Sequence, residues 1–393
     1  MRKFTAILLL LCLFQIPACQ SGGEASVSLN IPEAATTTPQ ITTFAPATTD
    51  APTATPTPTP TTTLPPTPEP TPEPTPTPIP EVLYEDEIYH IFFHALIAFP
   101  EISYNNGVSP LDQDCVLVDE FNRVLQQLYD NNYALIDINE TFSADADGNV
   151  TRTPVMVPEG KTPLILSVDD MVYDSRKMGT GMVDKLILDE NGKIASYTKH
   201  KDGTEVISYD NEVVTVLENF IAEHPDFSVR GARGMLAMTG FAGLFGYRTD
   251  SLSKNREEET EAVKPIVDAL RNLGWTFGCH GYGHADASTV SYSYFVADLN
   301  KWEAEVAPII GKASIYIYPY GHYVTSHGDK YQEMVRQGYR AMCAVSHKQY
   351  WTELGDALYM TRLGVDGYSL RNYRQYLLDL FDCDTVIDTQ YRR

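Results

Sequence analysis

Apolar residues recur along the chain with two different spacings. Short, nearly continuous apolar runs at 88–97, 133–138 and 163–168 predict buried β-strands, and those at 275–279 and 313–318 predict two more. Runs of this length and β-rich composition are typical of strands that are covered on both faces. The pattern therefore predicts a sheet in the interior of the protein.

Segments with helical spacing separate several of these runs. In 118–131, and again in 211–223 and 257–273, apolar residues fall three or four positions apart, as on one face of a helix. Strands that alternate with helices are typical of a parallel sheet with crossover helices. We therefore predict an α/β fold whose parallel sheet curls into a barrel.

One segment breaks this alternation. Residues 186–209 contain two turn dipeptides, Asn191-Gly192 and Asp202-Gly203, between runs of alternating polarity. This pattern predicts an inserted β-hairpin.

The N-terminus has the composition of a secretion signal. Positive residues at 2 and 3 precede an uncharged apolar run, 4–16, which is too short to span a bilayer of roughly 30 Å. The small residue Ala18 before Cys19 resembles the lipobox of bacterial lipoproteins. We expect 1–18 to be a lipoprotein signal peptide and Cys19 to carry a lipid anchor outside the cytoplasmic membrane. An ordinary secretory peptide with an incidental cysteine is the alternative.

A proline-rich segment follows the signal. Of the 26 prolines in the chain, 16 lie between Pro32 and Pro80, mostly next to threonine. Such a composition has little apolar surface to bury and favours extended polyproline II backbone, which could reach up to roughly 180 Å. We predict that 19–80 is a disordered linker that extends into the cell wall, and that 81–393 is one catalytic domain.

Charge and cysteine content exclude some classes of protein. The net charge is −23, and no Lys or Arg occurs between Lys3 and Arg123, so a nucleic-acid binder is excluded. Beyond the signal and Cys19, four cysteines remain, and they allow either three disulfide pairings or buried free thiols. They are Cys115, Cys279, Cys343 and Cys383.

Polar residues follow three of the predicted strands. Asp169 and Asp170 come after the first, His280 and His284 after the second, and the segment 318–322 after the third. In a parallel barrel these strand ends meet at one face, where functional groups gather. One carboxylate and two imidazoles suit a divalent metal with open positions, and the second carboxylate is then available as a base. Taken singly, an Asp pair or a Tyr-Pro-Tyr-Gly sequence is more often an ordinary turn.

Together these motifs resemble those of the NodB-type polysaccharide deacetylases, which are metal-dependent carbohydrate esterases with a distorted (β/α) barrel. The resemblance covers about 90–381. It implies that Asp170, His280 and His284 bind a divalent metal such as Zn²⁺, Co²⁺ or Ni²⁺. It also implies that Asp169 removes a proton from the attacking water.

The resemblance assigns further roles. It implies that His94 protonates the leaving amine, with His322 as a second candidate, and that Arg362 pairs with Asp169. A backbone N–H near Tyr320 would stabilise the oxyanion. The implied substrate is an N-acetylglucosamine-type glycan of the cell wall or extracellular matrix. The substrate-binding residues implied by the third motif are Tyr318, Pro319, Tyr320, Gly321 and His322.

Several positions depart from the family pattern. Met171 replaces a glycine beside the metal, Gly281 replaces a hydroxyl residue, Ile317 replaces an arginine, and no histidine follows His347. These departures favour one alternative, a catalytically degenerate carbohydrate-binding or scaffold lipoprotein on the same fold. A glycosidase that uses Asp169 with another carboxylate is a third possibility, and it would not need a metal.

Overall fold

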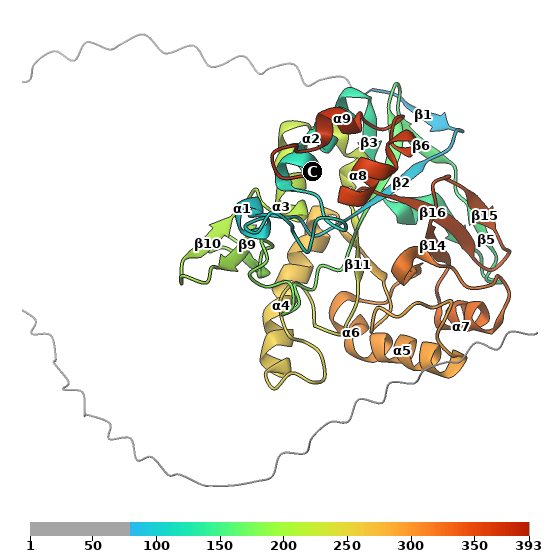
Figure 1. Cartoon of the computed structure of the whole chain (residues 1–393). Coiled ribbons are helices and arrows are strands. Elements are labelled where there is room, and N and C mark those ends of the chain that lie inside the picture. The colour runs from blue at the N-terminus through green and yellow to red at the C-terminus, as the bar shows by residue number, and fades with distance from the viewer. Residues whose placement is uncertain (1–78, 393) are drawn as a thin grey trace, which may run out of the picture. The chain divides into compact units, whose positions relative to one another are not determined.

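The computed structural model describes residues 79–392 (Figure 1). The predicted signal peptide 1–18, Cys19 and nearly all of the predicted 19–80 linker lie outside the described residues. Within 79–392, no helix combines the length and apolar character needed to cross a membrane.

A parallel sheet closes on itself to form the predicted barrel. One edge of β7 pairs with β2, and its other edge pairs first with β3 (Tyr133–Leu135) and then with β11, which closes the ring. The strands follow one another around the barrel in the order β11, β12, β13, β14, β16, β2 and β7. Their bounds are β2 (Tyr89–His94), β7 (Thr162–Asp169), β11 (Met235–Met238), β12 (Thr276–Cys279), β13 (Ile315–Ile317), β14 (Ala341–Val345) and β16 (Leu358–Gly364).

Side chains alternate between the two faces of each barrel strand. In β7, Leu164, Leu166 and Val168 belong to the large core between barrel and helices, whereas Ile165 belongs to the smaller core inside the barrel. The same alternation turns Ser167 and Asp169 inward. Polar groups therefore occupy the barrel interior toward the carboxyl end of β7.

The helices cover the outside of the barrel and confirm the three that the sequence predicted (Figure 1). The helix expected at 211–223 begins at Val213, because the carboxylate of Glu212 caps it by accepting the N–H of Val213. The helices are α1 (Pro100–Ser103), α2 (Val118–Asp130), α3 (Val213–Glu223), α4 (Arg256–Leu273), α5 (Tyr292–Glu305), α6 (Ala307–Ile310), α7 (Asp329–Gln337), α8 (Gly367–Asn372) and α9 (Cys383–Val386).

The predicted insert forms a three-stranded antiparallel sheet, so the expectation of a single hairpin is corrected. Strand β9 (Ile194–Lys199) pairs with both β8 (Lys185–Leu188) and β10 (Glu205–Ser208). The two expected turn dipeptides lie in the connections between these strands. In Figure 1 this sheet stands at the side of the barrel, next to α3 and α1.

The strand predicted at 133–138 is shorter than expected. It ends at Leu135 because Asp137 starts a 3₁₀ helix, η1 (Ile138–Thr141), by accepting the N–H of Asn139. The other short elements are strand pairs and 3₁₀ turns. They are β1 (Glu81–Tyr84) with β6 (Val155–Pro158), β4 (Phe142–Ala144) with β5 (Val150–Arg152), β15 (Trp351–Glu353) on β16, η2 (Pro225–Phe227), η3 (Val229–Gly231), η4 (Pro319–Gly321) and η5 (Arg374–Tyr376).

The described cysteines are free thiols. All four are buried, and burial raises the pKa of each thiol, so they are unreactive in the folded protein. Of the two outcomes that the sequence left open, the structure therefore shows buried free thiols. The four are Cys115, Cys279, Cys343 and Cys383.

Candidate active site

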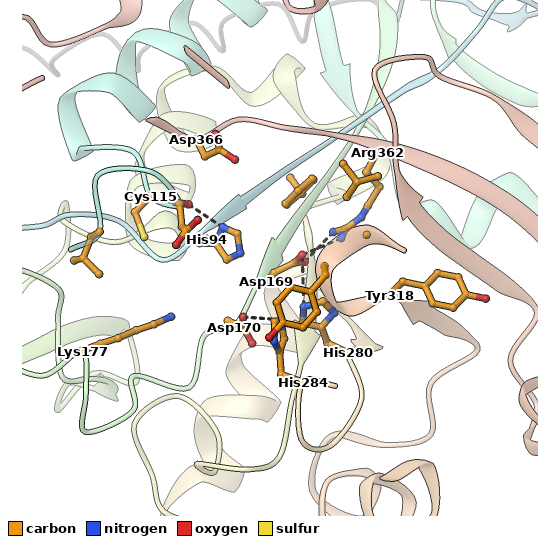
Figure 2. A pocket seen from close by; sticks show the side chains of 16 residues that line it. His94, Cys115, Asp169, Asp170, Lys177, His280, His284, Tyr318, Arg362 and Asp366 are labelled. Carbon is orange, nitrogen blue, oxygen red and sulfur yellow. Dashed lines mark hydrogen bonds and ion pairs between the residues drawn. The ribbon is translucent and has the colours of Figure 1, made fainter. Parts of the chain in front are cut away.

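A cavity of about 330 Å³ opens at the carboxyl ends of the barrel strands (Figure 2). Its lining includes residues from all three sequence motifs, which follow separate strands. Its lining is Phe92, His94, Leu111, Asp114, Cys115, Asp169, Asp170, Lys177, His280, His284, Tyr318, Tyr320, Gly321, Val345, Arg362 and Asp366.

Three of these side chains form a candidate metal site. One ligand atom from each of Asp170, His280 and His284 lies within 4.8 Å of the others. Nε2 of His284 lies 3.3 Å from Oδ2 of Asp170. Nδ1 of His280 donates to the carbonyl of Ile317 at 2.9 Å, which leaves its Nε2 as the nitrogen available to an ion. The donor set and the fixed tautomer fit a divalent metal such as zinc.

Asp170 has a negative charge available for such an ion. Burial alone would raise the pKa of Asp170, but the imidazoles of His280 and His284 offset this effect and leave its pKa below the usual value. Burial lowers the pKa of His284, which favours the neutral ring that coordinates metals.

Asp169 is held by an arginine inside the barrel. Nη1 and Nη2 of Arg362 donate to its two carboxylate oxygens at 2.8 and 2.9 Å, and both side chains are buried. Burial by itself would raise the pKa of Asp169, but Arg362, followed by His280, lowers it well below the usual range. Nη1 of Arg362 also donates to Ser167, whose hydroxyl contacts Nε2 of the buried His90.

His94 lies on the strand next to Asp169. The backbones of the two residues are paired in register between β2 and β7. Nδ1 of His94 donates to the carbonyl of Asp114 at 2.8 Å, so Nε2 is the nitrogen available on the cavity side. Figure 2 shows the ring on the side of the cavity where Cys115 lies, across from His280 and His284.

The third motif divides between cavity and core. The ring of Tyr318 is fully buried and points away from the metal-site residues, with its hydroxyl 3.3 Å from that of Tyr359 (Figure 2). Tyr320 is instead 64% exposed, and its ring lies 4.8 Å from that of His284. The backbone of Tyr320 has φ 60°, which turns its side chain out of the barrel interior.

Of the other three residues of this motif, only one lines the cavity. Gly321 lines the cavity, and a Cβ there would lie 2.4 Å from that of Val345. Pro319 and His322 are not among the lining residues. The side chain of His322 is 63% exposed and Nδ1 lies 2.8 Å from Asp286, so the structure places the second candidate acid outside the cavity.

Sequence reasoning missed a residue that supports the histidine loop. Asp298 on α5 accepts the backbone N–H groups of Tyr282 and Gly283, at 2.7 and 2.8 Å, between the two metal-site histidines. A carboxylate thus supports the loop that lacks a hydroxyl at Gly281. No sequence motif marks Asp298, because it lies on a helix, α5, that begins several residues after the loop with the two histidines.

Lys177 was also missed. It lies in the connection between β7 and β8, residues 170–184, and its side chain reaches the cavity (Figure 2). An isolated lysine in a loop carries no sequence signal for a site.

No protein-family model matches the chain, and no curated protein matches it. Several solved structures are similar over most of the described residues. A deacetylase from Streptococcus pyogenes, PplD in complex with acetate, is 14% identical with a TM-score of 0.43 and covers 72% of this chain and 93% of its own.

Two further solved structures match this chain with similar sequence identities and TM-scores. A polysaccharide deacetylase from Bacillus cereus is 13% identical with a TM-score of 0.43, and the match covers 75% of this chain and 69% of that one. A de-N-acetylase from Aggregatibacter actinomycetemcomitans is 14% identical with a TM-score of 0.41, and the match covers 75% of this chain and 100% of that one.

Proposed function

We propose that the protein is a metal-dependent deacetylase that hydrolyses N-acetyl groups of a polysaccharide of the N-acetylglucosamine type. One observation carries this proposal. The three metal-site side chains share a cavity with an ionised, arginine-held carboxylate, Asp169, and with an imidazole, His94, whose Nε2 is available. Amide hydrolysis needs a base, an acid and an electrophile in this arrangement.

A divalent ion held by Asp170, His280 and His284 would polarise the amide carbonyl and lower the pKa of a water molecule toward neutrality. Asp169 accepts the proton of the attacking water, and Arg362 keeps it ionised and oriented.

The acid step falls to His94. In its protonated form, Nδ1–H stays on the carbonyl of Asp114 while Nε2–H is transferred to the nitrogen of the breaking C–N bond. The backbone N–H of Tyr320 donates to the oxygen that gains charge as water adds to the carbonyl. The products are acetate and the free amine.

A surface of aromatic side chains supports a glycan as substrate. His347 stacks on Tyr376 with ring centroids 4.3 Å apart and an interplanar angle of 8°, and Tyr373 packs against both rings. Tyr368 extends this surface at 5.2 Å from Tyr373. Flat rings with polar edges suit the apolar faces and hydroxyls of sugars. We name these four residues the aromatic platform.

Two members of the aromatic platform lie close to lining residues along the chain. His347 and Tyr368 each follow a lining residue, Val345 and Asp366 respectively, by two positions. A sugar chain whose acetamide enters the cavity could therefore rest on the platform with its neighbouring units.

The location outside the cytoplasm is proposed from sequence alone. We propose that residues 1–18 are removed, that Cys19 carries the lipid anchor, and that 19–80 spans the distance to a glycan substrate in the wall, leaving 81–393 as the catalytic domain.

The test uses purified protein stripped of metal and reloaded with Zn²⁺, Co²⁺ or Ni²⁺. We expect acetate release from N-acetylglucosamine oligomers only in the loaded protein. Asp170→Asn should lose both metal and activity, Asp169→Asn should keep metal and lose activity, and Asp286→Asn, outside the cavity, should keep both. Absence of acetate release from every N-acetylated glycan by fully loaded wild-type protein would overturn the proposal.

One alternative function is a glycan-binding protein that does not catalyse hydrolysis. The absence of any histidine after His347 favours this alternative. The same experiment separates the two. A binding protein would retain glycan affinity in both wild type and Asp169→Asn and release acetate in neither. A glycosidase would shorten the glycan without added metal.

A further inference from the structure

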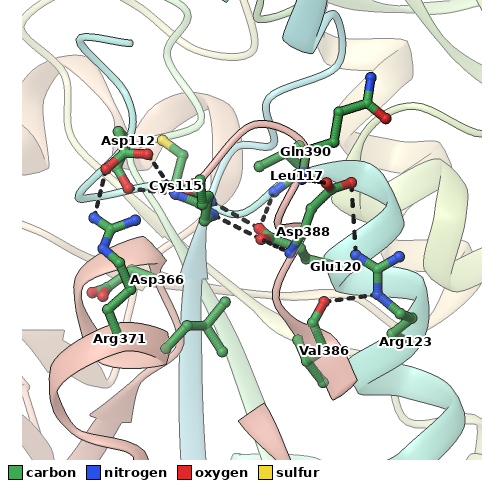
Figure 3. A network of polar contacts seen from close by, with 12 residues as sticks. Asp112, Cys115, Leu117, Glu120, Arg123, Asp366, Arg371, Val386, Asp388 and Gln390 are labelled. Carbon is green, nitrogen blue, oxygen red and sulfur yellow. Dashed lines mark hydrogen bonds and ion pairs between the residues drawn. The ribbon is translucent and has the colours of Figure 1, made fainter. Parts of the chain in front are cut away.

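A network of polar contacts that includes Asp112, Cys115 and Glu120 lies behind one wall of the cavity (Figure 3). It contains a fully buried ion pair between Glu120 and Arg392. Nε and Nη2 of Arg392 donate to the two carboxylate oxygens of Glu120 at 2.7 and 2.8 Å, and both side chains are 0% exposed. Glu120 also accepts the backbone N–H groups of Leu117 and Asp388, each at 2.9 Å. Glu120 on α2 therefore anchors the segment that carries Arg392.

The stability of the fold does not by itself explain why this ion pair is buried here. Removing two charges from water costs about as much as their attraction returns, and apolar residues of similar size often stabilise a protein equally well. The guanidinium has further donors, however. Nη1 of Arg392 donates to the carbonyl of Asp112 and Nη2 to the carbonyl of Cys115, both at 2.6 Å.

The two carbonyls belong to the wall segment, residues 111–115. Leu111, Asp114 and Cys115 of this segment line the cavity. Asp114 lies between the two carbonyls that Arg392 holds, and its own carbonyl accepts Nδ1–H of His94 at 2.8 Å. Arg392 thus fixes the backbone on both sides of the one group that sets the tautomer of His94.

A second part of the cavity rim contacts the same guanidinium. A Cβ at Gly367 would lie 1.9 Å from the carbonyl oxygen of Asp112 and 2.0 Å from Nη1 of Arg392, so only glycine fits there. The next residue, Tyr368, donates its backbone N–H to the carbonyl of Gln113 at 3.0 Å. The wall segment is therefore held between Arg392 and the start of α8.

We propose that Arg392 is a positioning residue for His94. It holds the wall segment so that the carbonyl of Asp114 receives Nδ1–H and Nε2 stays directed at the substrate. The catalytic meaning of this arrangement rests on the proposed function, whereas the tautomer itself does not.

The test measures ¹⁵N chemical shifts of the His94 ring in the full protein at about pH 8.5, where an ordinary imidazole is neutral. Wild type should show a single tautomer with hydrogen on Nδ1. Arg392→Met combined with Glu120→Gln removes both charges together, so that neither is left buried alone. This double variant should show a mixture of tautomers.

Two further variants separate positioning from folding. Arg123→Gln is the matched control, because Arg123 holds the carbonyl of Val386 to α2 without touching the wall segment. It should keep the single tautomer. Gly367→Ala displaces the Asp112 carbonyl from the other side and should give the mixture even where the double variant fails to fold.

Kinetics supply the second readout. In the double variant we expect kcat for acetate release to fall at least about tenfold while zinc affinity stays within twofold of wild type. A single unchanged tautomer in both the double variant and Gly367→Ala would overturn the inference, even in an active enzyme. Inactivity of the wild type would contradict the proposed function and leave the tautomer result standing.

Discussion

Both carboxylate oxygens of Asp169 are bound by the guanidinium of Arg362, at 2.8 and 2.9 Å, inside the barrel. A bidentate pair of this kind fixes the plane of the carboxylate as well as its charge. Each oxygen still has a lone pair that can accept a proton from water. Asp169 is therefore a weak base in a fixed position. A weak base would be sufficient if a bound metal ion lowers the pKa of the attacking water.

Replacement of Arg362 should weaken catalysis and change its pH dependence. In Arg362→Gln, burial acts on Asp169 without the opposing positive charge, so the pKa of Asp169 rises. As the pH falls, Asp169 therefore becomes protonated, and stops acting as a base, at a higher pH than in wild type. We expect kcat/KM at neutral pH to fall about 100-fold or more, and its acidic limb to move up by at least about one pH unit.

The measurement is a pH profile of acetate release from pH 4 to 9. Arg336→Gln serves as control, since Arg336 pairs with Glu333 on α7, apart from the cavity. An acidic limb that stays in place in Arg362→Gln would contradict the role given to the pair.

Loss of Asp298 should weaken metal binding without removing a ligand. Asp298→Ala leaves the backbone N–H groups of Tyr282 and Gly283 without their acceptor, which loosens the loop between the metal-site histidines. We expect zinc affinity to fall about 10- to 100-fold, in the range found for supporting partners of metal ligands. Competition with a zinc-binding dye measures this change. Asp268→Ala, on the exposed side of α4, should leave affinity unchanged, and an unchanged affinity in Asp298→Ala would refute this support.

The aromatic platform should matter only for long substrates. Tyr376→Ala removes the ring on which His347 stacks, and with it one aromatic face of the platform that a sugar unit would contact. We expect kcat/KM for a pentasaccharide to fall up to about tenfold while that for a disaccharide changes little. Tyr292→Ala, at an exposed tyrosine on α5, is the control. Equal losses on both substrates would show that the platform acts on stability and not on the sugar chain.

Stability should depend on pH through Glu212. Burial raises the pKa of Glu212 to about 7, although the N–H groups of Val213 and Leu96 bind the charged form. Because the folded-state pKa lies above the unfolded one, Glu212 favours folding fully below about pH 4.5, and this contribution disappears as the pH rises through 7. The total effect is on the order of 3 kcal/mol.

Urea unfolding at pH 5 and pH 8 tests this expectation. Glu212→Gln keeps an acceptor for both N–H groups and cannot ionise, so its free energy of unfolding should exceed that of wild type at pH 8 but not at pH 5. A constant difference between the two proteins at both pH values would exclude Glu212 as the titrating group.

Local patterns in the sequence predicted the barrel class and four of the seven barrel strands, β2, β7, β12 and β13, whereas β11, β14 and β16 were not predicted. The apolar spacing at 118–131 matches α2 within one residue, and the run at 163–168 matches β7 with one residue more at each end. The barrel itself followed from the alternation of strands and helices, because parallel strands need crossover connections. The 133–138 strand was overestimated, since the cap formed by Asp137 competes with the sheet.

Within the site, the groups that directly follow strands were predictable and those brought in by tertiary contacts were not. Asp170, His280 and His284 meet because the ends of parallel strands meet. Asp298 reaches the site from a helix, and the sequence gives no sign of that approach. The opposite orientations of the tyrosine rings at 318 and 320 depend on one left-handed backbone residue, which composition does not reveal.

The ion pair between Glu120 and Arg392 joins residues 272 positions apart. A nascent chain that has not yet extended to 392 can already contain every side chain of the metal site, but its cavity wall has no guanidinium to hold it. On the proposed function, the ligands of the metal are therefore synthesised well before the residue that orients the acid.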